Sequence, residues 1–174
     1  MNRQEYTLEE ISYSRKEHCR IMDKVLNDWF KDPKALNFVA PSFSFPFQFK
    51  KWKSKFYKSE ATELTTIILK KEDWIIGHLS IALENKTGNL FNLFIDPIYR
   101  NKGLAIKMVN EIESFGYNEG LREFSVSITP RNKAAIALFN KLKYKEKDKK
   151  SVGMVRMLKT MDGQINELFD GFHK

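Results

Sequence analysis

The sequence predicts a mixed α/β domain, of the α/β or α+β class, in which helices flank a central sheet of about six to seven strands. Two patterns support this prediction. Three β-rich segments follow one another across short turns between residues 63 and 95, which is typical of an antiparallel meander. A strand–helix–strand–helix unit follows, and such a unit adds parallel pairing. The sheet should therefore be mixed and mostly antiparallel, and 174 residues suit a single domain over residues 1–174.

The start of the chain predicts one strand and one long helix. Residues 5–12 form the expected strand. Ser14 and Glu17 make a capping-box pattern, which begins a helix that extends to about Phe30. Asp32-Pro33 is expected to end this helix, because the residue before a proline avoids helical geometry.

The middle of the chain predicts the meander, after an irregular stretch over residues 34–59. This stretch carries phenylalanine at every second position from 43 to 49 and contains two prolines, and residues 50–58 predict a short basic helix. Strands are then expected over 63–69, 74–83 and 90–95, because β-branched or alternating apolar residues fill these segments.

The last third of the chain predicts the strand–helix–strand–helix unit. Apolar residues recur at helical spacing over 105–115, and Gly120 closes that helix. Residues 124–128 alternate as a strand, and 135–142 present one apolar helical face. A final strand over 152–158 and a short terminal helix over 162–172 complete the expected order.

Composition limits the partners and the compartment. The net charge of +8 suits a polyphosphorylated ligand, nucleic acid or an anionic surface, but the basic residues are spread along the chain. The densest run, 141–150, contains two acidic residues and is expected to be a solvated face. Cys19 is the single cysteine, so no internal disulfide or zinc cluster is expected, and we expect no metal. No targeting or membrane-spanning segment is evident, so a cytoplasmic location is expected.

The segment from Ile95 to Ala105 joins an expected strand to an expected helix and has the features of an anion site. Small residues at Gly103 and Ala105 let a ligand approach the backbone. The first N–H groups of the helix have no partners within it, and the helix dipole is positive at this end. Arg100 and Lys102 add positive charge. These residues alone also fit an ordinary turn with a solvated basic pair, and both readings stay open.

Two motifs resemble the GNAT acetyltransferases. Arg100, Gly103 and Ala105 occupy the three defining positions of that family's motif A, Arg/Gln-x-x-Gly-x-Gly/Ala. Asn132, Ala135 and Leu138 match its motif B, Asn-x-x-Ala-x-x-Leu-Tyr, and one helix and one strand fit between the motifs. The region of Gly77 resembles the weaker third-strand pattern. The two strong motifs cover about residues 90–145.

The resemblance implies a GNAT fold, in which two parallel strands splay apart to admit acetyl-CoA as the acyl donor. The backbone of Phe94 and Ile95 would face the pantetheine arm, the turn would hold the pyrophosphate, and Asn132 would hydrogen-bond the arm besides capping its helix. The full set implied for cofactor binding is Phe94, Ile95, Arg100, Asn101, Lys102, Gly103, Leu104, Ala105, Asn132, Ala135 and Phe139.

Catalytic groups are less evident. The Ile95 N–H is the expected oxyanion donor, but the family's general-acid tyrosine is replaced by Phe139. A thiolate leaves without help, since a thiol pKa is about 8.5. Where relatives carry a carboxylate base, this chain has Asn92 and Ser127. His78 is a further candidate base, and water chains could end in one of three acidic residues, Glu60, Glu63 and Glu84.

The expected activity is acetyl transfer to a primary amine of a small molecule or peptide, by direct attack on the thioester. The alternative is a non-catalytic acyl-CoA-binding sensor or scaffold. A nucleic-acid-binding module is a third hypothesis, which the absence of a recognisable binding motif disfavours. No nucleic-acid or membrane partner is expected, and a homodimer stays open. The phenylalanines of residues 43–49 would line the acceptor site or, as the favoured reading, pack a lid into the core.

Overall fold

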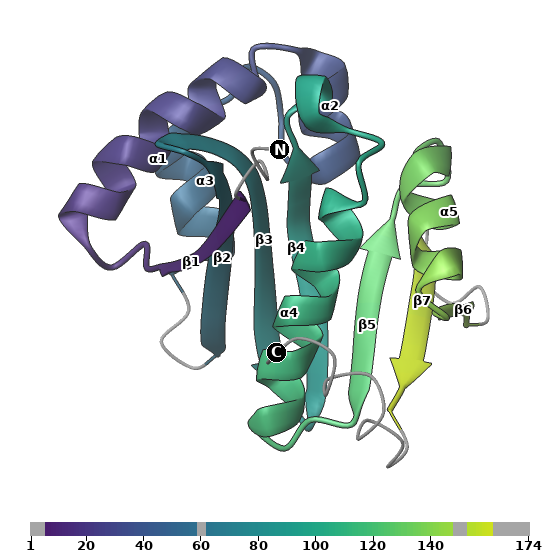
Figure 1. The fold of residues 1–174 in the computed structure, drawn as a ribbon. Helices are drawn as coiled ribbons and strands as arrows, with labels where there is room; N and C mark the ends of the chain where they lie inside the picture. Colours follow the sequence, from purple (N-terminus) through teal and green to yellow (C-terminus); the bar gives the residue numbers. More distant parts are fainter. Residues whose placement is uncertain (1–5, 59–61, 148–152, 162–174) are drawn as a thin grey trace, which may run out of the picture.

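A computed structural model describes residues 6–58, 62–147 and 153–161. The sheet has seven strands in the order β1-β2-β3-β4-β5-β7-β6 (Figure 1). The strands are β1 (Tyr6–Ile11), β2 (Glu63–Lys71), β3 (Trp74–Glu84), β4 (Thr87–Ile95), β5 (Glu123–Ile128), β6 (Lys145–Glu146) and β7 (Val155–Thr160). The helices are α1 (Lys16–Trp29), α2 (Pro33–Val39), α3 (Phe49–Phe56), α4 (Leu104–Asn118) and α5 (Lys133–Lys141). The predicted fold class is confirmed, and the terminal helix expected over 162–172 lies outside the described residues.

Two helix starts differ from the sequence-based expectations. The capping-box prediction at Ser14 is wrong: Arg15 is the N-cap of α1 without a side-chain cap, and the Ser14 hydroxyl contacts that of Ser12. Helix α2 is absent from the sequence-based prediction, in which Asp32-Pro33 only ends the preceding helix. Proline is equally suited to the first turn of a helix, and the Asp32 carboxylate accepts the N–H of Lys34 at 2.9 Å as an N-cap.

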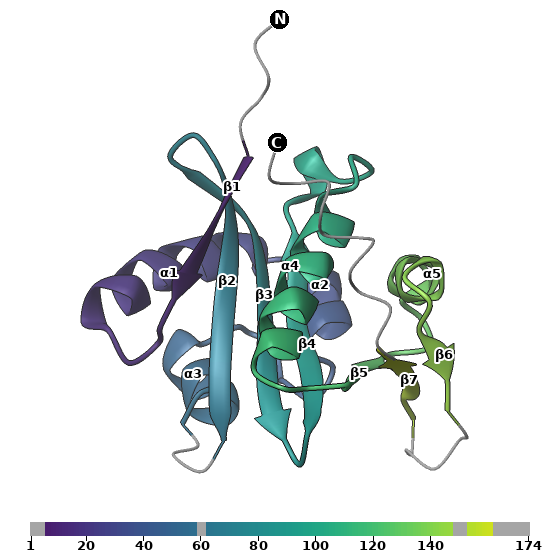
Figure 2. The same cartoon turned by 60° about the horizontal axis from the view of Figure 1, so that its bottom comes forward.

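Two hydrophobic clusters lie on opposite faces of the sheet. Helix α4 packs over β3 and β4 on one face, while α1, α2 and α3 cover the other, as Figures 1 and 2 show. Helix α4 approaches the sheet closely at Gly77, where a Cβ would lie 2.9 Å from both Ile95 Cδ1 and Met108 Sδ. Glycine at this position therefore permits the contact between α4 and β3.

The phenylalanines of residues 43–49 divide between the two proposed roles. Phe47 is buried, and Phe43 and Phe49 pack against the cluster of α1, α2 and α3. This agrees with a lid packed into the core. Phe45 is the exception, with 51% of its surface exposed.

The central structural feature is the separation of two parallel strands. Strands β4 and β5 pair only from Thr87↔Glu123 to Leu90↔Val126. Beyond these residues β4 continues to Ile95 and β5 continues to Ile128, but the two strands no longer pair with each other. The expected splay of the two strands is therefore present. None of the described helices combines the length and apolar character needed to cross a bilayer.

Candidate active site

A pocket of about 780 Å³ opens where β4 and β5 separate. Four parts of the chain line it: the end of β4, the turn into α4, one side of α2 and one side of α5. From the β4 end, the turn and the first residues of α4 come Leu93, Phe94, Ile95, Pro97, Tyr99, Arg100, Asn101, Gly103, Leu104, Ala105 and Ile106. From the helices and their N-caps come Asp32, Lys34, Ala35, Phe38, Val39, Asn132, Ala134, Ala135, Ala137, Leu138 and Lys141.

The turn into α4 exposes backbone N–H groups to this pocket. Asn101 and Gly103 have φ angles of 60° and 74°, a left-handed geometry that asparagine and glycine tolerate best. Gly103 is the N-cap of α4, and no side chain caps the helix. No heavy atom lies within 4 Å of the position that a Gly103 Cβ would occupy. The first turn of α4 is thus an uncapped, open site suited to an anion.

The backbone of Ile95 faces the separation of the strands. Asp96 N–H donates to the Ile76 carbonyl of β3 at 2.8 Å. Successive residues of a strand direct their backbone groups to opposite edges, so the N–H and C=O of Ile95 point away from β3. The Ile95 carbonyl accepts Arg100 Nε at 2.9 Å. This leaves the Ile95 N–H directed toward the region where β5 has diverged.

The basic residues of the turn take different positions. The Arg100 guanidinium lies 5.2 Å from the centre of the Phe94 ring and anchors the turn to β4. Lys102 lies 5.3 Å from the Tyr99 ring and does not line the pocket. Arg100 therefore shapes the end of β4, while Lys102 contributes charge from outside the pocket.

Helix α5 forms the opposite wall with three small side chains, Ala134, Ala135 and Ala137. Asn132 caps this helix, since its Oδ1 accepts the Ala135 N–H at 3.2 Å. The Nδ2 group of Asn132 retains its two hydrogens for a ligand. Phe139 points elsewhere: it is 1% exposed, does not line the pocket, and packs edge-on against Tyr144 at 4.9 Å.

His78 belongs to β3, where it pairs with Phe94 of β4, and its side chain is buried. It is 1% exposed, its Nδ1 lies 2.8 Å from the Asn92 carbonyl, and its Nε2 lies 2.9 Å from the Tyr13 hydroxyl. Because a carbonyl can only accept, Nδ1 carries the hydrogen and Nε2 accepts from Tyr13. Burial lowers the pKa of His78 to about 4. The ring is therefore neutral, with both nitrogens engaged.

Asn92 belongs to the same buried network. Its φ of 53° accompanies a register shift between β3 and β4, so it forms a bulge in the strand. Its side chain donates to the Tyr57 hydroxyl at 3.1 Å, and that hydroxyl lies 2.8 Å from Ser80 Oγ. Tyr57 was not anticipated from the sequence, where it follows a basic helix. Burial raises the pKa of its hydroxyl well above the usual value.

The remaining candidate bases lie away from the pocket. Ser127 is an exposed residue that pairs with Arg156 of β7. Glu63 and Glu84 are at the end of the sheet where β3 turns into β4, whereas Ile95 pairs with Gly77 near the other end of β3. Glu60 lies outside the described residues. In the described part of the chain, no three His, Cys, Asp or Glu side chains gather as a metal site.

The neutral His78 predicts a specific loss of stability in acid. Its pKa is about 4 in the folded chain, against 6.5 ordinarily, so the unfolded chain takes up this proton first as the pH falls. Stability should be fully present above pH 6.5 and decline between pH 6.5 and 4, by up to about 3 kcal/mol. Urea unfolding across this range measures the slope. A His78→Gln variant should lose this part of the slope; an unchanged slope in that variant would contradict the assignment.

The arrangement defines a class of protein: an α/β fold in which two parallel strands separate beside an uncapped helix start, a geometry that suits an elongated ligand with phosphate groups. Comparison with known proteins agrees. A family model described as the acetyltransferase (GNAT) family matches residues 23–144. The match covers more than half of the chain, so the chain belongs to this family and is an N-acetyltransferase. No curated protein matched the sequence.

Solved structures share the fold at low sequence identity. The GNAT domain of S. lividans PAT superposes with a TM-score of 0.74 and 13% identity, over 88% of this chain and 89% of that one. The PaiA N-acetyltransferase of Thermoplasma acidophilum, solved with coenzyme A, gives 0.68 and 15%, over 90% and 99%. The spermidine N-acetyltransferase of Vibrio cholerae, solved with CoA and spermine, gives 0.68 and 14%, over 92% and 97%.

Proposed function

We propose that this chain transfers the acetyl group of acetyl-CoA to a primary amine by direct attack of the amine on the thioester. The observation that carries the proposal is the position of the Ile95 N–H. It faces the separation of β4 and β5, beside a pocket that runs to the uncapped start of α4. One donor for a developing oxyanion and one anion site thus lie along the same pocket.

The cofactor residues divide by the part of acetyl-CoA that they suit. The backbone N–H groups of Asn101, Lys102, Gly103, Leu104 and Ala105 would hold the pyrophosphate. The Nδ2 of Asn132 would donate to the pantetheine arm, and the alanine face of α5, which includes Ala135, would let the arm lie close to the helix. The open position at Gly103 fits this use, because a Cβ there would occupy the approach of the phosphate.

The chemistry needs little acid–base help from the chain. Acetyl-CoA supplies an acetyl group already activated as a thioester. As the amine forms the new C–N bond, the Ile95 N–H would donate to the carbonyl oxygen that gains negative charge. The C–S bond then breaks, and the thiolate leaves unassisted because a thiol pKa is about 8.5. The proton that the attacking nitrogen still has to lose passes to water, and the amide product keeps one N–H. Phe139 can give no proton, and its burial places it with the core.

In the described residues, the candidate bases lie away from the pocket, and this makes a prediction about pH. Because His78 is buried and neutral, the amine must lose its proton to water. We therefore expect kcat/KM to rise as the pH increases toward the pKa of the acceptor amine. Among similar acceptors at neutral pH, those of lower amine pKa should react faster, until falling nucleophilicity offsets the gain. The test is a pH series with two acceptors of different pKa. A profile that levels near pH ~6.5 for both acceptors, and loses this limb in His78→Gln, would contradict the proposal.

A second function is a non-catalytic acyl-CoA sensor or scaffold. One observation favours it: in the described residues, no histidine lines the pocket, and its one carboxylate, Asp32, caps α2. Labelled acetyl-CoA, offered with a panel of small amines and peptides, separates the two. Acceptor-dependent thiol release with matching label in the amine supports the enzyme. Saturable binding without any release over the panel supports the sensor.

A further inference from the structure

We propose that the acceptor of this enzyme is a small amine that also carries a carboxylate and an apolar body. This inference rests on the proposed function and specifies the substrate class of the same site. It comes from a second hollow, of about 530 Å³, which adjoins the cofactor pocket. Lys34 and Phe38 of α2 line both, so the two spaces meet along this helix.

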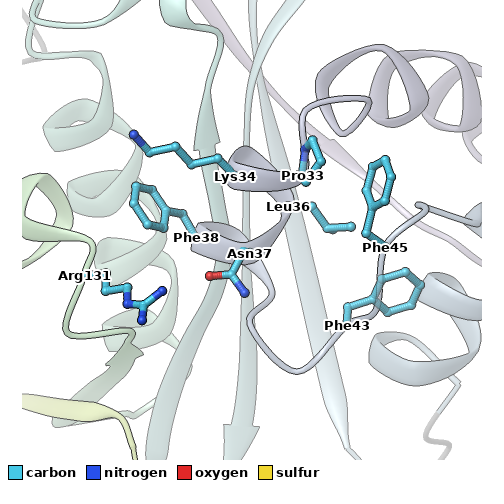
Figure 3. A pocket seen from close by; sticks show the side chains of 8 residues that line it. All are labelled: Pro33, Lys34, Leu36, Asn37, Phe38, Phe43, Phe45 and Arg131. Carbon is cyan, nitrogen blue, oxygen red and sulfur yellow. The ribbon is translucent and has the colours of Figure 1, made fainter.

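The walls of the hollow are apolar and aromatic. Figure 3 shows Phe38 and Arg131 on one side of α2, Phe43 and Phe45 on the other, and Asn37 between them. Phe45 is 51% exposed although its neighbour Phe47 is buried in the core. An exposed aromatic side chain in a hollow of this size suits the apolar part of a small ligand.

The charged groups of the hollow are both cationic. Arg131, from the turn before α5, and Lys34 line it, and in the described residues no aspartate or glutamate does. The Arg131 guanidinium forms no hydrogen bond or ion pair with any described residue and is exposed. The Lys34 ammonium lies 5.6 Å from the Phe38 ring. A planar guanidinium left without a partner is suited to a carboxylate, which it binds through two parallel hydrogen bonds.

The same charges disfavour a polycation. An acceptor with several ammonium groups would meet two like charges and find no carboxylate to pair with, which costs affinity. An amine with one carboxylate can instead pair that anion with Arg131, while its reactive nitrogen has no ion-pair partner in the hollow. Such a molecule fills the hollow with its apolar body and directs its amine along α2 toward Ile95.

The experiment compares each variant with the parent on the same acceptor, for amines with and without a carboxylate, so that differences in amine pKa cancel. 4-(Aminomethyl)benzoate is paired with benzylamine, phenylalanine with phenylalaninamide, and spermidine is the polycation. Thiol release gives kcat/KM for the parent, for Arg131→Gln and for Arg156→Gln. Arg156 is the charge-matched control, because it is exposed on β7 and lines neither space.

Arg131→Gln should lower kcat/KM for the carboxylates about tenfold or more, through KM, and leave kcat/KM for the amines without a carboxylate within twofold. Arg156→Gln should change neither class, and acetyl-CoA affinity should be unchanged in both variants. 3-Phenylpropanoate should inhibit the parent competitively with the amine and inhibit Arg131→Gln more weakly. If kcat/KM for phenylalanine and for 4-(aminomethyl)benzoate falls alike in Arg131→Gln, the carboxylate itself is recognised.

Equal loss in Arg131→Gln for acceptors with and without a carboxylate, or a parent preference for spermidine, would overturn this inference and leave acetyl transfer standing. If the parent binds acetyl-CoA but releases no thiol with any amine, the proposed function fails and the inference fails with it. Failure of both is therefore distinguishable from failure of the acceptor assignment alone.

Discussion

Gly103→Val is expected to lower the affinity for acetyl-CoA by about 100-fold or more. The substituted side chain would occupy the open space above the first turn of α4, where a Cβ at Gly103 meets no protein atom. A pyrophosphate kept away from this turn would lose at least two charge-assisted hydrogen bonds, each contributing about 1.5–3 kcal/mol. Calorimetric titration with acetyl-CoA measures the loss directly.

The same helix provides a matched control. Gly120 follows the C-terminal end of α4, has a φ of 90° and likewise meets no atom within 4 Å of a built Cβ. Valine at either glycine should therefore cost a similar, modest stability, about 1–2 kcal/mol, because a side chain is strained at positive φ. Gly120→Val should bind acetyl-CoA as the parent does. Equal affinities for the parent and both variants would show that the pyrophosphate does not lie on this turn.

Lys159→Met is expected to destabilise the fold by about 3–5 kcal/mol. Lys159 Nζ lies 2.7 Å from Glu113 Oε2, and the Tyr144 hydroxyl donates to Oε1 at 2.7 Å. The Glu113 side chain is only 2% exposed, so loss of the lysine leaves a buried carboxylate without its counter-charge. Since β4 and β5 pair over only four residues each, this contact is a further tie between α4 and the β5–β7 side of the sheet.

Two further variants test the cause of this loss. Lys70→Met removes another strand lysine, but its partner Glu9 is 50% exposed, so the cost should be below about 1 kcal/mol. Glu113→Gln combined with Lys159→Met should recover most of the loss, because the amide oxygen still accepts from Tyr144 and no charge is buried. Urea unfolding gives all four free energies. Similar losses in Lys159→Met and Lys70→Met would mean that burial of Glu113 is not the cause.

The parts of the site that the sequence predicted are local in the chain. Asn101, Gly103 and Ala105 belong to one strand–helix turn, so their spacing alone brings their backbone groups together. The N-cap at Asn132 was expected from its place before a helix, and the same residue lines the pocket. The strands and helices of the mixed sheet followed from the period of their apolar residues. At Gly77 a side chain would collide with neighbouring atoms, because α4 lies close to the sheet there.

The parts that were missed depend on contacts distant in sequence or on orientation. His78 meets Tyr13 across 65 residues, and Tyr57 meets Asn92 across 35, so no local pattern shows that these groups satisfy one another. The motif position of Phe139 was recognisable, but its direction into the core depends on Tyr144. A signal for α2 was present: aspartate followed by proline is also a helix start.

A crystal structure of the chain soaked with acetyl-CoA tests the central claim most directly. The account predicts pyrophosphate oxygens about 3 Å from backbone nitrogens of residues 101–105 and the thioester oxygen at a similar distance from the Ile95 nitrogen. The acetyl group would then lie between β4 and β5, facing α2. Acetyl-CoA bound with its pyrophosphate away from the start of α4, or with its thioester remote from Ile95, would contradict the account.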